Sequence, residues 1–206
     1  MFILLIVFIV LCVRLITFLP SPKLKKADGY TFLIVLGSGG HTTEMLKLLK
    51  SIEPKASRVR ITFVVADTDS SSIPRISSVL SNKFKYQIKR IPRIRSVGES
   101  ILIAFFRIPL IFLKSAQLAL QASPDAILVN GPGTCIPIVF TSLLIQYMML
   151  QKRSVVVFIE SFCRTKTISL TGRILYNVVD SFILQWKPDS SLQRRFPRAR
   201  YLGTLI

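Results

Sequence analysis

A glycine-rich turn between a strand-type run and a helix-type run constrains the fold of this chain more than any other segment. The hexapeptide at residues 37–42, Gly-Ser-Gly-Gly-His-Thr, follows the apolar run at 30–36 and precedes a run with helical spacing at 43–49. Glycines permit positive φ angles and close backbone approach, so successive N–H groups can converge on an anion at the positive end of a helix dipole. The pattern predicts an anion-binding turn, although a turn that serves packing alone would look the same.

The residues predicted to bind the anion are those of the turn itself: Gly37, Ser38, Gly39, Gly40, His41 and Thr42. His41 is the only histidine of the chain, so any imidazole chemistry must use it. It could serve as a general base toward a hydroxyl group, bind phosphate, or support a neighbouring residue through a hydrogen bond. The turn lacks the lysine of a Walker A sequence, and Thr42 stands where a dinucleotide fingerprint has Gly or Ala.

Strand-type and helix-type runs alternate from residue 30 to the C-terminus. Such alternation predicts a parallel sheet covered by helices, that is, one α/β, Rossmann-like, doubly wound domain over residues 30–206. The expected strands are at 30–36, 58–66, 84–91, 126–130, 154–160, 181–185 and 199–202. The expected helices are at 42–51, within 70–80, and at 99–122, 133–151 and 171–179.

The N-terminal segment predicts a transmembrane helix. Residues 2–19 are apolar apart from Arg14, and this length is just sufficient to span a bilayer. No positive n-region precedes the segment and no small-residue cleavage site follows it, which favours an uncleaved anchor at 1–20 over a signal peptide. Lys23, Lys25 and Lys26 make residues 21–29 a basic linker, and the positive-inside rule then places residues 30–206 of a single-pass protein in the cytosol.

The chain is strongly basic, with 28 Lys and Arg against 10 Asp and Glu and a formal net charge of +18. Such a balance is typical of proteins that bind nucleic acid, an anionic membrane or a phosphate-bearing substrate. No nucleic-acid-binding module has its signature here, so the densest basic run, at 83–95, favours lipid headgroups and pyrophosphate. Arg93 and Arg95 of this run are predicted to help bind the anion, and a solvated basic face is the alternative.

The chain offers no recognisable metal or cofactor site. Its three cysteines, Cys12, Cys135 and Cys163, lack metal-ligand spacing, and their odd number indicates no disulfide framework. No Gly-x-Ser-x-Gly elbow is present either. We therefore expect neither metal nor cofactor, and a domain in a reducing compartment.

A second glycine turn follows the fourth expected strand. It contains Asn130, Gly131, Gly133 and Thr134, and Thr134 is placed to cap the helix that comes next. Ligands of open parallel sheets bind at the carboxyl ends of the strands, so the two glycine turns could face each other and hold a diphosphate. A turn needed only for chain reversal is the alternative.

An acidic residue, Glu160, ends the fifth expected strand. Burial there would raise its pKa, and the carboxylate could accept a hydrogen bond from a sugar hydroxyl. Arg164, four residues later, is predicted to help bind the anion. The structural alternatives for Glu160 are a helix cap and an ion pair with Arg164.

Two helical runs are unusually apolar, at 101–113 and 135–150. Arg107 and Pro109 interrupt the first, and Pro137 and several polar residues interrupt the second, so both are expected to pack on the sheet rather than to span a membrane. The first could contact a membrane surface through Phe105, Phe106 and Phe112, or use them only in the core.

The chain resembles one family in the order of six motifs, which together extend the likeness over residues 30–206. They are Gly37-Ser-Gly-Gly-His-Thr42, Ile91-Pro-Arg-Ile-Arg-Ser-Val-Gly98, Asn130-Gly-Pro-Gly-Thr-Cys-Ile-Pro137, Glu160-Ser-Phe-Cys-Arg164, Leu170-Thr-Gly-Arg-Ile-Leu-Tyr176 and Gln185-Trp186. The family is that of the membrane-anchor subunits of the two-part UDP-N-acetylglucosamine transferase that adds the second sugar to dolichol-linked oligosaccharide in N-glycosylation. More distantly, the chain is similar to the N-terminal half of the bacterial peptidoglycan-lipid N-acetylglucosaminyltransferase, which has the two-domain GT-B architecture.

The resemblance implies a division of labour between two chains. This chain would supply one half of a GT-B fold, would bind dolichyl-diphosphate-GlcNAc, and would not be an enzyme on its own. A separate soluble, catalytic, donor-binding subunit would be recruited to the cytosolic face of the endoplasmic reticulum. The resemblance further implies that the C-terminal tail docks this partner through Tyr201, Leu202, Gly203, Thr204, Leu205 and Ile206.

The resemblance also implies the reaction, the formation of a β-1,4 bond to N-acetylglucosamine. His41 or Glu160 would then orient or deprotonate the acceptor hydroxyl group. Two other functions stay open at this point. The chain could be a self-sufficient glycosyltransferase, or a pure membrane scaffold in which the glycine turns are vestigial.

Overall fold

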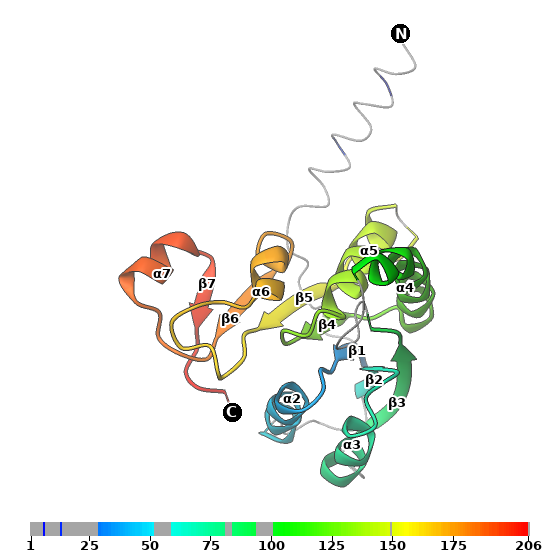
Figure 1. The fold of residues 1–206 in the computed structure, drawn as a ribbon, viewed down its shortest axis with the longest axis horizontal. Coiled ribbons are helices and arrows are strands. Elements are labelled where there is room, and N and C mark those ends of the chain that lie inside the picture. Colours follow the sequence, from blue (N-terminus) through cyan, green and yellow to red (C-terminus); the bar gives the residue numbers. More distant parts are fainter. Residues whose placement is uncertain are drawn as a thin grey trace.

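The computed structural model describes residues 29–51, 59–80, 84–93, 101–148 and 150–205, together with Ile6 and Val13. They form an α/β domain around one seven-stranded sheet in the order β3-β2-β1-β4-β5-β6-β7, with every neighbouring pair parallel (Figure 1). This confirms the predicted Rossmann-like, doubly wound class. The strands are β1 (Tyr30–Val35), β2 (Val59–Ala66), β3 (Lys85–Ile91), β4 (Ala126–Val129), β5 (Val155–Ile159), β6 (Ser181–Leu184) and β7 (Ala199–Tyr201).

The central strands are apolar along their length because both of their faces are covered. In β1, Leu33 and Val35 point into one hydrophobic cluster and Ile34 points into the other. The edge strand β3, with the sequence KYQIKRI, is exposed or half-buried except at its last residue, Ile91. Continuous apolar runs in the middle and a polar run at the edge are what a parallel sheet covered on both faces predicts.

Helices cover both faces of the sheet. They are α2 (Gly40–Ser51), α3 (Ser72–Leu80), α4 (Ile101–Ala122), α5 (Cys135–Tyr147), α6 (Leu170–Leu175) and α7 (Ser190–Arg195). Figure 1 shows α2 and α3 on one side of the sheet and α4, α5 and α6 on the other, and the two buried clusters divide in the same way. The prediction that the two apolar helices pack on the sheet is therefore confirmed for α4 and α5.

Two short helices differ from the sequence prediction. The helix expected at 171–179 ends at Leu175, where the chain turns and the N–H groups of Val178 and Val179 both donate to the Leu175 carbonyl. Helix α7 was not predicted at all. Its N-cap, Asp189, accepts a hydrogen bond of 2.7 Å from the N–H of Leu192, so a local cap starts a helix that has only one buried residue.

The predicted anchor at 1–20 and linker at 21–29 lie outside the described residues, apart from Ile6, Val13 and Gly29. Among the helices of the described ranges, none combines the length and the hydropathy needed to cross a membrane.

Candidate functional site

The two glycine turns meet at the carboxyl end of the sheet, at the point where strand order reverses. Strand β1 pairs with β2 on one side and with β4 on the other, which makes the gap between the β1 and β4 loops the switch point of the sheet. A Cβ atom added to Gly37 would lie 2.9 Å from the Cβ of Pro132. The predicted facing of the two turns is thus confirmed, and Gly37 is required for their close approach.

A cleft of about 420 Å³ opens between the two turns. The Arg93 guanidinium, after the end of β3, lies at this cleft and donates a 2.8 Å hydrogen bond to the Ser38 hydroxyl. It places a positive charge beside the positive ends of α2 and α5, neither of which has an acidic residue in its first turn. The residues that line the cleft are Leu36, Gly37, Ser38, His41, Ala66, Arg93, Pro132, Gly133 and Thr134.

The first glycine turn is held from behind by buried hydroxyl groups. Gly39 adopts φ +70°, as a glycine turn before a helix requires. The side chain of Thr42 is wholly buried and donates to the Gly37 carbonyl, and its oxygen lies 2.6 Å from the Ser72 hydroxyl. Ser72 donates in turn to Asp69 over 2.5 Å. Thr42, predicted as an anion ligand, therefore points its side chain into the support of the turn rather than into the cleft.

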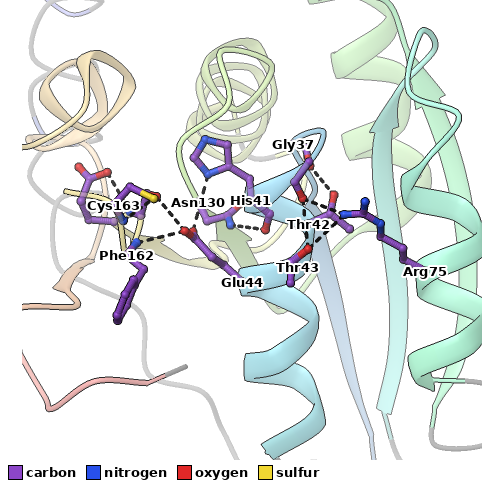
Figure 2. A network of polar contacts seen from close by, with 12 residues as sticks. Gly37, His41, Thr42, Thr43, Glu44, Arg75, Asn130, Phe162 and Cys163 are labelled. Atoms are coloured by element: carbon purple, nitrogen blue, oxygen red, sulfur yellow. Dashed lines mark hydrogen bonds and ion pairs between the residues drawn. The ribbon is translucent and has the colours of Figure 1, made fainter.

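Arg75 of α3 also supports this turn, on its exposed side. Its Nη1 donates to the Gly39 carbonyl over 3.2 Å and to the Thr43 hydroxyl over 3.1 Å (Figure 2). The N-terminus of α3 is fixed by Asp69, whose carboxylate accepts from the N–H groups of Ser71 and Ser72. Partial burial opposes ionisation of Asp69, but these hydrogen bonds outweigh it and hold its pKa below the ordinary value.

His41 lies between the two turns, with 35% of its side chain exposed. Its ring packs over Gly131, which adopts φ +97° and whose added Cβ would lie only 3.0 Å from the Cε1 of the imidazole. The Asn130 side chain donates a 2.7 Å hydrogen bond to the His41 carbonyl. Gly131 is therefore needed both for its backbone conformation and for the space above it, and Asn130 has a positioning role rather than a place in the cleft lining.

Thr134 differs from its predicted role as a helix cap. It has φ −60° and ψ −18°, helical angles, and its side chain makes no capping hydrogen bond. The N–H groups of Cys135 and Ile136 instead donate to the carbonyls of Pro132 and Gly133, so the turn closes on its own backbone. Thr134 and Gly133 still line the cleft, as predicted for the anion site.

Glu160 is buried away from the cleft lining, with 1% of its surface exposed. Burial raises its pKa, as predicted, against the opposing effect of two backbone hydrogen bonds, from the N–H of Ser161 at 3.0 Å and of Ser169 at 2.8 Å. Because both carboxylate oxygens are occupied and Ser169 caps α6, this geometry favours the capping alternative. Arg164 is exposed, lies outside the cleft lining, and forms no ion pair with Glu160 in the described part of the chain.

Glu44, which joins the first turn to the loop after β5, was not among the predicted site residues. Its Oε2 lies 3.8 Å from the Nδ1 of His41, and its Oε1 accepts from the Ser161 hydroxyl and the Phe162 N–H (Figure 2). The signal was present in the spacing, since residues three apart on a helix share a face. Among the described residues, the one ion-pair contact of His41 is with Glu44.

Two predicted site residues lie outside the described residues. They are Arg95, predicted to bind the anion, and Ile206, predicted to bind the partner subunit. Of the tail, Tyr201 ends β7 and is exposed, as is Leu202. The Leu205 N–H donates to the side chain of Gln185 over 3.1 Å, which holds the tail against the end of β6. In the described ranges, no group of His, Cys, Asp and Glu side chains could hold a metal ion.

The sequence matches a family model described as "Oligosaccharide biosynthesis protein Alg14 like" over residues 32–205. It is 37% identical over 205 residues to the human UDP-N-acetylglucosamine transferase subunit ALG14, a match that covers 95% of this chain and 92% of that one. It is 40% identical over 185 residues to the alg14 subunit of Schizosaccharomyces pombe, covering 87% and 85% of the two chains.

Among solved structures, MurG of Acinetobacter baumannii superimposes with a TM-score of 0.55 at 16% identity, over 77% of this chain and 42% of that one. LpCGTa, solved in complex with UDP, superimposes with a TM-score of 0.52 at 13% identity, over 86% and 53% of the two chains. At these identities the likeness concerns the fold alone. The chain thus spans about half or less of the length of the solved proteins that share its fold.

Proposed function

Since the chain belongs to the Alg14 family of oligosaccharide biosynthesis proteins, we propose that it is the acceptor-binding, membrane-anchoring subunit of a UDP-GlcNAc transferase of N-linked glycosylation. The acceptor is dolichyl-diphosphate-GlcNAc, which receives its second sugar. The observation that supports this most directly is the cleft between the two glycine turns, with Arg93 at its edge. The rest of the transferase is a second chain.

The cleft fits a diphosphate for three physical reasons. The N-termini of α2 and α5 place the positive ends of their helix dipoles at the cleft, although the N–H groups of Cys135 and Ile136 are already bonded within their own turn. The Arg93 guanidinium adds a full positive charge with several donors. The Ser38 hydroxyl, already oriented by Arg93, adds a neutral donor. A lipid diphosphate has two such anionic groups, one for each turn.

In the reaction, the 4-hydroxyl of the acceptor sugar attacks the anomeric carbon of UDP-GlcNAc. The new bond forms between that oxygen and carbon, the bond to UDP breaks, and UDP leaves with the electron pair. His41 accepts the hydroxyl proton, because it is the imidazole that lines the cleft. Glu160, the other candidate, instead supports the loop after β5, since both of its oxygens accept from backbone N–H groups.

The donor nucleotide binds to a partner subunit. The described residues form one Rossmann-like sheet, and its cleft between the glycine turns is the proposed acceptor site. We infer that this subunit does not transfer sugar alone, and that its tail recruits a soluble catalytic subunit. The relatives are themselves named as transferase subunits, which supports a heteromeric enzyme.

Besides the acceptor and the catalytic subunit, the proposed function includes contact with the membrane. We propose that the anchor predicted at 1–20 and the basic linker predicted at 21–29 hold the domain at the cytosolic face of the endoplasmic reticulum. On α4, Phe105 and Phe106 have exposed fractions of 65% and 79%, which supports contact of this helix with lipid. Phe112, the third aromatic residue of this group, is half-buried.

The test is purification of the full chain from detergent-solubilised membranes, followed by transfer of labelled sugar from UDP-GlcNAc to a short-chain analogue of dolichyl-diphosphate-GlcNAc. We expect a small soluble chain to co-purify and transfer to depend on both chains. We also expect Arg93→Gln to raise the KM for the acceptor, about tenfold or more, with the KM for UDP-GlcNAc unchanged.

Two outcomes would replace the proposal with one of its alternatives. Transfer by the purified chain without any partner would indicate a self-sufficient enzyme. Full transfer by assembled complexes with Gly39→Ala, His41→Ala and Glu160→Ala would indicate a scaffold in which the glycine turns have no role.

A further inference from the structure

The imidazole of His41 has one buried edge and one edge that faces the cleft. Its Nδ1 is buried and has no hydrogen-bond partner among the described residues, whereas His41 as a residue lines the cleft and its side chain is 35% exposed. The exposed edge is therefore the one that includes Nε2. For a histidine to accept a proton at Nε2, its other nitrogen must keep the N–H, and the group beside Nδ1 determines whether it does.

The group beside Nδ1 is the carboxylate of Glu44. Its Oε2 lies 3.8 Å from Nδ1, close enough for electrostatic attraction but longer than a hydrogen bond. Partial burial opposes ionisation of Glu44, but its contacts with His41, Ser161 and Phe162 outweigh this and hold its pKa below the ordinary value. Glu44 is thus an anion at neutral pH, aimed at the buried nitrogen.

The direction of the carboxylate is set from outside its own helix. Oε1 accepts a 2.8 Å hydrogen bond from the Ser161 hydroxyl and a 3.2 Å hydrogen bond from the Phe162 N–H. The Phe162 carbonyl accepts a 2.6 Å hydrogen bond from Trp186 Nε1, and the two aromatic rings lie 4.6 Å apart. Since Oε1 is fixed by two donors from this loop, the other oxygen is left for His41.

We propose that Glu44 is a positioning residue that fixes His41 in the Nδ1–H tautomer, so that Nε2 presents its lone pair to the acceptor hydroxyl. This inference rests on the proposed function for the identity of that hydroxyl, but not for the tautomer. The 3.8 Å separation shortens to a hydrogen bond when the acceptor engages Nε2, as catalytic contacts commonly do on binding. Glu44 then stabilises the imidazolium formed by proton transfer, and itself keeps no proton.

The bonding of Glu44 makes one substitution especially informative. In Glu44→Gln, the amide oxygen must take the Oε1 position, because both groups there donate to it. The amide nitrogen then faces Nδ1 and donates to it, which reverses the tautomer to Nε2–H. Glu44→Ala leaves Nδ1 with no nearby polar group and should give a mixture of tautomers.

Because His41 is the only histidine, selective ¹⁵N labelling of the full chain in detergent gives the signals of one imidazole. Above the pH range in which the ring is protonated, we expect the Nδ1–H pattern in the wild type, Nε2–H in Glu44→Gln, and a mixture in Glu44→Ala. Asp125→Asn, at the opposite end of the sheet, is the control and should keep the wild-type pattern. An Nε2–H pattern in the wild type would overturn the inference whether or not the complex transfers sugar.

The role of Glu44 in sugar transfer is tested separately, by kinetics of the assembled complex. Glu44→Gln should lower kcat about 100-fold, with the KM for the acceptor changed less than about threefold. Backbone amide spectra verify that the variant is folded. A reversed tautomer with unchanged kcat would show that Glu44 has no part in the reaction. If the wild-type complex did not transfer sugar, the proposed function would be rejected, but the tautomer assigned by NMR would be unaffected.

Discussion

At the residue scale, the site depends on a glycine whose role is spatial as well as conformational. Gly131 adopts φ +97°, and a Cβ there would lie 3.0 Å from the Cε1 of His41. We expect Gly131→Ala to lower the free energy of unfolding by about 1–2 kcal/mol from backbone strain and to displace the imidazole. Urea denaturation of the detergent-solubilised chain measures the first effect, and the signals of the single imidazole report the second.

Gly40→Ala is the matched control for stability. Gly40 begins α2, has no positive φ, and an added Cβ there would have no atom within 4 Å. Alanine is the better helix former, so the free energy of unfolding should stay within about 0.5 kcal/mol of the wild type or rise. Equal losses from the two substitutions would contradict the role assigned to Gly131.

The raised pKa of Glu160 predicts how the free energy of unfolding changes with pH. Burial raises its pKa above the ordinary 4.5, so the folded chain binds this proton more tightly than the unfolded chain. The contribution of Glu160 to stability is therefore fully present below about pH 4.5 and declines as the pH rises through the folded pKa. Glu160→Gln removes this titration, so the wild type should lose stability relative to the variant across that window. Parallel stability curves for the two proteins would refute the raised pKa.

The site residues that a backbone pattern determines were predictable from the sequence, and those that depend on loop packing were not. Gly37, Ser38 and His41 follow from a turn between strand and helix, and Arg93 from a basic run near a strand end. The occupation of both oxygens of Glu160 depends on the path of residues 161–169, which has no periodic pattern. A carboxylate at a strand end therefore predicted a buried acid correctly, but not what it would bind.

At the element scale, the N-terminus of α3 supports the first glycine turn. Asp69 fixes Ser72, and the Ser72 hydroxyl contacts buried Thr42, which holds the Gly37 carbonyl. We expect Asp69→Ala to lower the free energy of unfolding by about 1–2 kcal/mol and to raise the KM for the acceptor several-fold, because the turn loosens. Denaturation and transfer kinetics of the complex measure the two effects.

Asp189→Ala is the control that distinguishes a general loss of helix stability from loosening of the first glycine turn. Asp189 caps α7 by accepting from the Leu192 N–H, and its hydrogen bonds do not reach the glycine turns. A loss of about 1 kcal/mol with an unchanged KM is the expected result. If the two substitutions changed the KM equally, the chain of hydroxyl groups would have no specific role in the site.

The exposed aromatic end of α4 predicts a contact with lipid. In a Cys12→Ser, Cys135→Ala, Cys163→Ser background, Phe106→Cys should react slowly with a membrane-impermeant thiol reagent in proteoliposomes and quickly in denaturant. Leu120→Cys, on the same helix and about 21 Å further along it, should react at similar rates in both. Its parent side chain is also exposed, with a fraction of 47% against 79% for Phe106. Equal protection of both cysteines, or of neither, would argue against membrane contact at this end.

Elements with a buried apolar repeat were predictable, and elements without one were not. All seven strands were expected close to their observed bounds, because central strands of a covered parallel sheet must be apolar. Helix α7 has the sequence SSLQRR, in which one leucine and a cap are the entire signal. Its cap is local, but the burial of Leu192 in the core depends on contacts with residues far away in the sequence, and that information is not local.

At the scale of the whole molecule, the carboxyl edge of the sheet is where the proposed functions meet. The cleft, Glu44 and the loop after β5 all lie at this edge. The tail also reaches it, through the hydrogen bond of Leu205 to Gln185 directly after β6. A partner bound to the tail would therefore lie near the acceptor cleft, as two halves of one active site must.

The last prediction concerns that tail. Strand β7 ends at Tyr201, so deletion of residues 202–206 leaves its pairing with β6 intact and should change the free energy of unfolding by less than about 1 kcal/mol. It removes the exposed Leu202, and we expect the soluble partner no longer to co-purify and transfer to be lost. Gln185→Ala is the matched variant, because it removes the acceptor of the Leu205 N–H and keeps every tail residue. A tail that binds through its side chains should then retain the partner with moderately weaker affinity, whereas a partner that stays bound to the truncated chain would place the interface elsewhere.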